Sequence, residues 1–122
     1  MKIRRLAEDF EVMEVADVVL SGGPQACYRL QKRGIGTPEA IDQILRKWGL
    51  QRRAVSYGGL KDRHAITTQY LTIRNGPRKN LRLQHLHLEY LGQSPAPFGP
   101  GEILGNRFRL VLRSMNAAAT EA

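Results

Sequence analysis

Asp62 is the residue of this sequence whose surroundings best suit chemistry. It follows the glycines Gly58 and Gly59 and lies between Lys61 and Arg63. Glycines mark tight, exposed turns, and flanking cations favour the ionised form of a carboxylate. A negative side chain on such a turn is typical of a nucleophile or base that acts on nucleic acid. On spacing alone we favour the alternative, a turn aspartate that bonds to its own backbone.

The charge around this aspartate indicates a polyanionic partner. The segment from Gln43 to Leu88 carries ten Lys or Arg residues and one acid, Asp62. The whole chain of 122 residues has a net charge of +8 and a pI near 10.3. This surplus favours binding to nucleic acid or to an anionic membrane face. Residues 8–17 carry five acids and no base, so we expect a polyanion to contact the middle of the chain and to avoid that segment.

Composition bounds the remaining classes. The length suits one domain with a modest core, and no apolar run approaches transmembrane length. The first ten residues have no apolar stretch of the secretory kind. The single cysteine, Cys27, suits a reducing compartment and a buried, inert position. We therefore expect a cytoplasmic protein with no membrane partner; a membrane-surface protein is a weaker alternative because no basic amphipathic helix is predicted.

The histidines and glycine-rich loops offer weaker signals. His85 and His87 would share a strand face, but no cluster of further ligands accompanies them, so we predict solvent-facing histidines and no metal. His64 either touches a substrate or caps its turn. The loop 32–37 either holds a phosphate at a helix N-terminus or forms a turn and a cap. There is no Walker loop and no dinucleotide fingerprint, which leaves reactions that need one nucleophile and no metal.

One helix should position the centre of the chain. Thr37 is a plausible N-cap, Pro38 suits the first helical position, and Gly49 ends the pattern. An apolar stripe at helical spacing lies between these signals: Ile41, Ile44, Leu45 and Trp48. The pattern predicts a helix over about residues 38–48.

Strands should make up most of the rest. Alternation predicts them near residues 9–15, 27–32, 54–57, 67–74, 86–90 and 107–113. We expect the first two to pair antiparallel across the glycine turn between them. Strands with short links favour an α+β fold with a mainly antiparallel sheet. Phe108 shares a strand face with Leu110 and Leu112, which by itself favours core packing for Phe108, and residues 114–122 resemble a flexible tail or a truncated continuation.

Four blocks of the sequence, in order, resemble the motifs of the TruD family of pseudouridine synthases. The blocks are Glu8-Asp9-Phe10-x-Val12-x-Glu14, Lys32-Arg33-Gly34-x-x-Thr37, Gly59-Leu60-Lys61-Asp62-Arg63-x-Ala65-x-Thr67-x-Gln69 and Gly101-x-x-x-Gly105-Asn106-x-Phe108-x-x-x-x-Arg113. Because they spread over residues 8–113, the resemblance is specific, whereas any single block would be weak.

The resemblance implies a cofactor-free isomerase that acts on uridine in tRNA, typically at position thirteen. Asp62 would be the nucleophile, Asn106 would hold its carboxylate, and Phe108 would stack on the flipped uracil. The candidate phosphate contacts are Lys61, Arg63, Arg74, Arg78 and Lys79.

The match covers only the front of the family's catalytic domain. Residues 1–113 would be the N-terminal part of that domain, and the later blocks, the inserted domain and the C-terminal part of the catalytic domain are missing. Gly58 stands where the family usually has alanine, a difference that should be tolerated. A non-catalytic basic RNA-binding module is the alternative function, since it makes no demand on Asp62.

Overall fold

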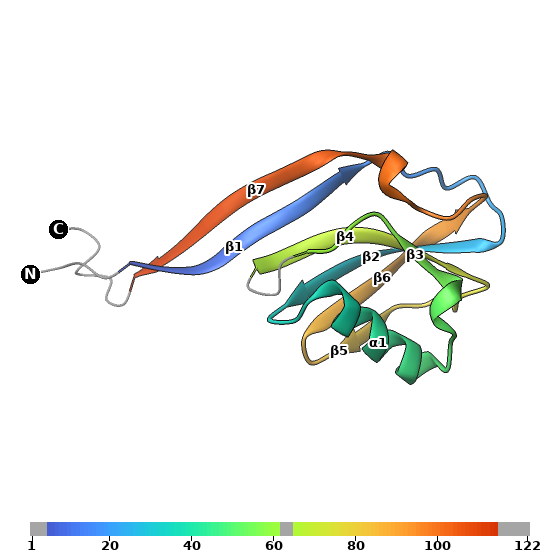
Figure 1. Ribbon diagram of the computed structural model, residues 1–122, viewed down its shortest axis with the longest axis horizontal. Coiled ribbons are helices and arrows are strands. Elements are labelled where there is room, and N and C mark those ends of the chain that lie inside the picture. Colours follow the sequence, from blue (N-terminus) through green and yellow to red (C-terminus); the bar gives the residue numbers. More distant parts are fainter. Residues whose placement is uncertain (1–4, 62–64, 115–122) are drawn as a thin grey trace, which may run out of the picture.

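The protein is an α+β domain with a mainly antiparallel sheet, as predicted (Figure 1). The computed structural model describes residues 5–61 and 65–114, and the side chains of residues 11–61 and 65–109. The elements are β1 (Arg5–Ala16), β2 (Gln25–Arg33), α1 (Thr37–Trp48), the 3₁₀ turn η1 (Arg52–Ala54), β3 (Val55–Tyr57), β4 (Ala65–Arg74), β5 (Leu81–Leu83), β6 (Leu86–Ser94), the 3₁₀ turn η2 (Pro100–Glu102) and β7 (Ile103–Ser114).

The sheet brings both ends of the described chain to one edge. Its order is β5-β6-β2-β4-β1-β7, and β3 pairs with the second half of β4. All neighbouring strands run antiparallel except β1 and β4, which are parallel over four pairs from Phe10↔Ala65 to Met13↔Thr68. The expected pairing of β1 with β2 is wrong because β4 lies between them. Alternation of polar and apolar residues identifies strands, but it does not determine which strands, distant in sequence, pair with each other.

The core lies between the sheet and α1, on one face. Ile41 and Ile44 of α1 are buried against Leu71 and Ile73 of β4, as the helical stripe requires. The ring of Tyr28 from β2 lies 5.8 Å from that of Trp48. No helix of the described chain is both long and apolar enough to cross a membrane.

The start of α1 differs from the prediction. Gly36, not Thr37, is the N-cap, and its backbone N–H donates to Glu39 Oε1 at 3.0 Å. Thr37 is the first helical residue. The C-terminal cap is as expected, since Gly49 has the left-handed φ of +65° that favours glycine. The Thr37 hydroxyl is thereby left for other partners.

The strands β1 and β7 form a long two-stranded ribbon. They pair from Arg5↔Ser114 to Ala16↔Ile103, whereas β1 pairs with β4 over four residues only. Figure 1 shows the ribbon extending beyond the rest of the sheet toward both termini. Glu11 of β1 lies 3.8 Å from Arg109 of β7. The acidic segment near the N-terminus is therefore partly paired within the fold.

Candidate functional site

The loop between β3 and β4 carries the candidate nucleophile, Asp62. Tyr57 ends β3 and Ala65 begins β4. Asp62, Arg63 and His64 lie outside the described residues. The loop is described up to Lys61, so the position of Lys61 tells where the chain enters the Asp62 segment.

The two glycines of this loop, Gly58 and Gly59, differ in how much space surrounds them. Neither has a positive φ. A Cβ on Gly58 would lie 2.2 Å from Ile103 Cδ1, whereas a Cβ on Gly59 would meet nothing within 4 Å. Gly58 is thus in close contact with β7, and an alanine at this position would be accommodated if the end of the Ile103 side chain moved.

The main chain of the loop is held from α1 and β4. The Lys61 N–H donates to Thr37 Oγ1 at 2.8 Å, and the Thr37 hydroxyl donates to Gln69 Oε1 at 2.9 Å. Gln69 Nε2 in turn donates to the Gly59 carbonyl at 3.0 Å. Thr37 and Gln69 are both fully buried. Two buried side chains therefore fix the loop at two points just before Asp62.

A buried lysine adds a third attachment. Lys32 is 2% exposed, and its Nζ donates to the Ile35 carbonyl at 2.8 Å and to the Lys61 carbonyl at 3.4 Å. Lys32 therefore joins the loop that enters α1 to the loop that carries Asp62. For the hypothesis that loop 32–37 holds a phosphate, this geometry leaves Lys32 turned inward to backbone oxygens.

The Lys61 side chain is paired with Glu14. Lys61 Nζ lies 3.1 Å from Glu14 Oε2, and the two side chains are 9% and 0% exposed. This is a close ion pair without the alignment of a hydrogen bond. The other oxygen, Glu14 Oε1, accepts the Tyr70 N–H at 2.9 Å. The predicted contact of Lys61 with phosphate would require its ammonium to leave Glu14.

The sheet register brings Glu14 to the same face as the loop. Gln69 reaches α1, so its side chain is on the helix face, and Thr67, two residues earlier on β4, shares that face. Val12 is opposite Thr67 in the parallel pair. Glu14 follows Val12 by two residues and lies on the helix face as well.

The same argument places Asn106 and Phe108. Asn106 is opposite Glu14 and Phe108 is opposite Val12 in the β1–β7 pair, and cross-strand partners share a face. Both residues are exposed, Phe108 to 62%. The interpretation of Phe108 as a core residue is therefore wrong. Its exposed ring and Asn106 lie one strand from Glu14, the partner of Lys61.

The other predicted phosphate contacts are elsewhere. Arg74 ends β4, nine residues from Ala65, and Arg78 and Lys79 follow in the loop to β5. At the rise of an extended strand this separates Arg74 from the Asp62 end of β4 by about 30 Å. All three side chains are exposed. Arg74 therefore lies at the end of β4 away from the Asp62 segment, and Arg78 and Lys79 lie in the loop that follows this end.

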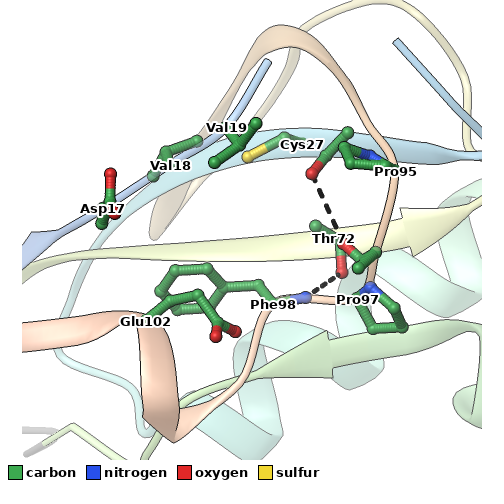
Figure 2. A pocket seen from close by; sticks show the side chains of 11 residues that line it. Asp17, Val18, Val19, Cys27, Thr72, Pro95, Pro97, Phe98 and Glu102 are labelled. Atoms are coloured by element: carbon green, nitrogen blue, oxygen red, sulfur yellow. Dashed lines mark hydrogen bonds between the residues drawn. The ribbon is translucent and has the colours of Figure 1, made fainter. Parts of the chain in front are cut away.

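A separate hollow lies where β2 and β4 meet the loop before β7 (Figure 2). The cavity has a volume of about 220 Å³, and Cys27, Thr72 and Phe98 line it. The Phe98 N–H donates to Thr72 Oγ1 at 2.9 Å. Burial raises the pKa of the Cys27 thiol to about 11, so this cysteine stays protonated at neutral pH and is not a nucleophile. Cys27 is buried, as the sequence indicated.

The histidines of the described chain form no metal site. No group of three or more His, Cys, Asp or Glu side chains in that part of the chain could hold a metal ion. His85 is exposed in the turn between β5 and β6, and His87 is half-buried on β6. The prediction that the two histidines share a strand face is therefore wrong, because His85 lies in the turn and only His87 lies on a strand.

Sequence reasoning missed the four residues that hold the loop: Glu14, Lys32, Thr37 and Gln69. Each belongs to one of the motif blocks, but the sequence predicts a helix cap for Thr37, places Lys32 in loop 32–37, and gives no role for Glu14 or Gln69. Thr37 is separated from its partner Lys61 by 24 residues of sequence, and Glu14 is separated from its partner Tyr70 by 56. The signal that could have identified these four residues is a polar side chain at a position that is buried in the fold.

Comparisons with known proteins agree on one family. A family model described as tRNA pseudouridine synthase D (TruD) matches residues 1–122. A protein of Methanococcus maripaludis named probable tRNA pseudouridine synthase D 1 is 38% identical over 118 residues, which are 95% of this chain and 30% of that protein. The tRNA pseudouridine synthase D of an Anaeromyxobacter species is 35% identical over 124 residues, covering 98% of this chain and 36% of that protein.

A solved structure has the same fold. The crystal structure of the putative TruD from Methanosarcina mazei matches with a TM-score of 0.80 and 28% identity, over 88% of this chain and 25% of that one. The chain spans about a third of the length of the curated relatives described here.

Proposed function

Since the chain belongs to the TruD family of tRNA pseudouridine synthases, we propose that it supplies the N-terminal part of the catalytic domain of such an enzyme. Residues 1–113 are that part, and residues 114–122 are a flexible tail or the start of its continuation. The substrate is a uridine of tRNA, at position thirteen, and the protein acts in the cytoplasm. The reaction converts this uridine into pseudouridine.

The reaction needs one nucleophile and balances without an oxidant or reductant. The bond from uracil N1 to the ribose C1′ breaks and a bond from C5 to C1′ forms. The proton on C5 leaves and N1 gains one, so the product is an isomer of the substrate. Asp62 is the nucleophile that assists cleavage and rejoining, and its cationic neighbours Lys61 and Arg63 favour its ionised form.

The observation that carries this proposal is the register of β1 with β7. It puts Asn106 and Phe108 on the face where Lys61 meets Glu14, and Asp62 follows Lys61 directly. An amide at Asn106 is suited to orient a carboxylate by hydrogen bonding. The exposed ring of Phe108 is suited to stack on a flipped uracil, a contact worth about 1–3 kcal/mol.

The experiment replaces the corresponding segment of a full-length relative with this chain and assays pseudouridine formation in a tRNA transcript. We expect the chimera to be active and Asp62→Asn to abolish turnover. Phe108→Ala should weaken productive binding, whereas Arg109→Gln, on the opposite face of β7, is the matched control on that strand. Turnover retained by Asp62→Asn would end the nucleophile assignment.

A non-catalytic RNA-binding module is the second candidate. The net charge of +8 on a chain that spans about a third of its relatives favours it. It predicts that RNA binding survives Asp62→Ala while no chimera forms pseudouridine. The measurement is tRNA binding by the isolated chain beside product formation by the chimera.

A further inference from the structure

The Thr37 hydroxyl, at the start of α1, makes hydrogen bonds to residues outside the helix. Because Gly36 caps α1, the hydroxyl is free to bond outside the helix. It accepts the Lys61 N–H at 2.8 Å and donates to Gln69 Oε1 at 2.9 Å. One buried hydroxyl thus serves as both acceptor and donor, so its hydrogen is directed at Gln69.

Gln69 completes the connection to the loop. Its oxygen accepts from Thr37 and its nitrogen donates to the Gly59 carbonyl at 3.0 Å. Both Thr37 and Gln69 are 0% exposed. The Gly59 carbonyl and the Lys61 N–H, two residues apart, are therefore attached to one rigid pair of side chains, which we call the Thr37–Gln69 clamp.

Removing the hydroxyl would cost more than one bond. It would leave the Lys61 N–H and Gln69 Oε1 without their partner in a buried site, where an unsatisfied polar group is expensive. The loop would have to shift or admit water. Consecutive Cα atoms are 3.8 Å apart, so a shift of Lys61 is passed directly to Asp62.

We propose that Thr37 and Gln69 are positioning residues of uridine isomerisation, which fix the main chain at Gly59 and Lys61 and thereby set the place of the nucleophile. This inference rests on the proposed function. Neither residue touches the substrate. Misplacing a reacting group by about 1 Å costs about a hundredfold in rate, so the clamp acts on turnover and hardly on substrate binding.

The matched control is Thr67. It is another fully buried threonine on the same face, and its Oγ1 has no hydrogen-bond partner among the described residues. Thr37→Val and Thr67→Val make the same isosteric change, but only the first removes bonds to the loop. Thr37→Ser keeps the hydroxyl and loses a methyl group.

The first measurement uses the chain itself and follows amide hydrogen exchange at Lys61 by NMR. Thr37→Val should speed exchange of the Lys61 N–H by about tenfold, the value of one net hydrogen bond, and Thr37→Ser should not. Thr67→Val should leave Lys61 unchanged. Equal exchange at Lys61 in Thr37→Val and Thr67→Val would overturn the clamp.

The second measurement uses the chimera with a full-length relative. Thr37→Val should lower kcat by about 10- to 100-fold with KM nearly unchanged, and Thr37→Ser should restore most of it. Adding Gln69→Leu to Thr37→Val should lower kcat further, because it also removes the bond to the Gly59 carbonyl. The combined loss should be smaller than the sum of the two single losses, since both substitutions break the bond between Thr37 and Gln69. A rise in KM without a fall in kcat would overturn the positioning role. So would an equal loss of kcat in Thr37→Val and Thr67→Val that parallels an equal fall in melting temperature.

The two proposals can fail separately. If the unsubstituted chimera forms no pseudouridine, or Asp62→Asn keeps turnover, the proposed function fails and the catalytic part of this inference fails with it. If Asp62→Asn abolishes turnover while Thr37→Val keeps it, only the positioning role is wrong.

Discussion

At the scale of single residues, the buried pair of Glu14 and Lys61 determines what Lys61 contributes. The Lys61 ammonium is 3.1 Å from a carboxylate that is itself inaccessible to solvent. The second oxygen of that carboxylate is occupied by the Tyr70 N–H. The pair therefore ties the loop before Asp62 to β1, opposite Asn106.

Breaking this pair should destabilise the fold. Removing one partner of a buried ion pair leaves an uncompensated charge, at a cost of about 3–5 kcal/mol. We expect Lys61→Met to lower the free energy of unfolding by roughly this amount in urea titrations. Glu14→Gln combined with Lys61→Met should be less damaging than Lys61→Met alone, because no buried charge then remains.

The exposed pair of Asp42 and Arg46 on α1 is the control for this prediction. Asp42→Asn should change the free energy of unfolding by about 0.5 kcal/mol or less, since solvent screens the pair. A double variant that is as unstable as the sum of its single variants would contradict the interpretation of Glu14 and Lys61 as a coupled pair.

At the scale of elements, close contact between the β3–β4 loop and the start of β7 sets the choice of glycine at position 58. A Cβ there would lie 2.2 Å from Ile103 Cδ1 and 3.0 Å from its Cγ1. The contact links the loop that leads to Asp62 with the strand that carries Asn106. Gly59 has no such neighbour.

Gly58→Ala should therefore be destabilising and its effect should be reversible. We expect a loss of about 1–3 kcal/mol from overpacking, at the lower end because the contacted atom ends a flexible side chain. Ile103→Val removes Cδ1 and should recover most of the loss when combined with Gly58→Ala. Thermal or urea unfolding measures both effects, and Gly59→Ala, which should be nearly neutral, is the comparison. Equal effects of the two glycine substitutions would refute the steric argument.

The elements themselves were largely predictable, while their partners were not. The stripe from Ile41 to Trp48 gave α1, and alternation gave each strand except β5, whose three residues are too short for a period to show. The pairing of β1 with β4 instead of β2 depends on contacts across the whole chain. The exposed face of Phe108 follows from the same register, which no local pattern contains.

The candidate site was predictable only as a set of motif positions. The resemblance pointed to Asn106 and Phe108, and the register groups them with Glu14. The hydrogen bonds of Thr37 could not be foreseen. Threonine is common as a helix N-cap, so its presence at a helix start does not indicate any further partner. The position of Arg74, at the far end of β4 from Ala65, likewise could not be predicted without knowing how far β4 extends.

At the scale of the whole molecule, positive charge is distributed well beyond the site. Arg74 is exposed about 30 Å along β4 from Ala65, and Arg78 and Lys79 are exposed in the loop that follows it. These cations therefore suit binding of the RNA backbone and not the chemical step.

Changing Arg74, Arg78 and Lys79 together to Gln should weaken tRNA binding by the isolated chain. We expect the slope of log K against log salt concentration to fall by about 2–3 in magnitude, close to one per lost phosphate contact. The matched control replaces three other cations, Arg46, Lys47 and Arg53, and tests whether net charge alone is responsible. Equal losses in the two triple variants would contradict a localised contact.

The position of β7 at the edge of the sheet, beside the first strand, has a consequence for biosynthesis. As the chain leaves the ribosome, β1 emerges early, but the strand that covers most of its length emerges only after β2 to β6. Ordering such distant segments is slow, because loop closure must precede their contacts. The helix and the strands β2 to β6 can thus assemble first, and the face that holds Glu14 beside Asn106 is completed last.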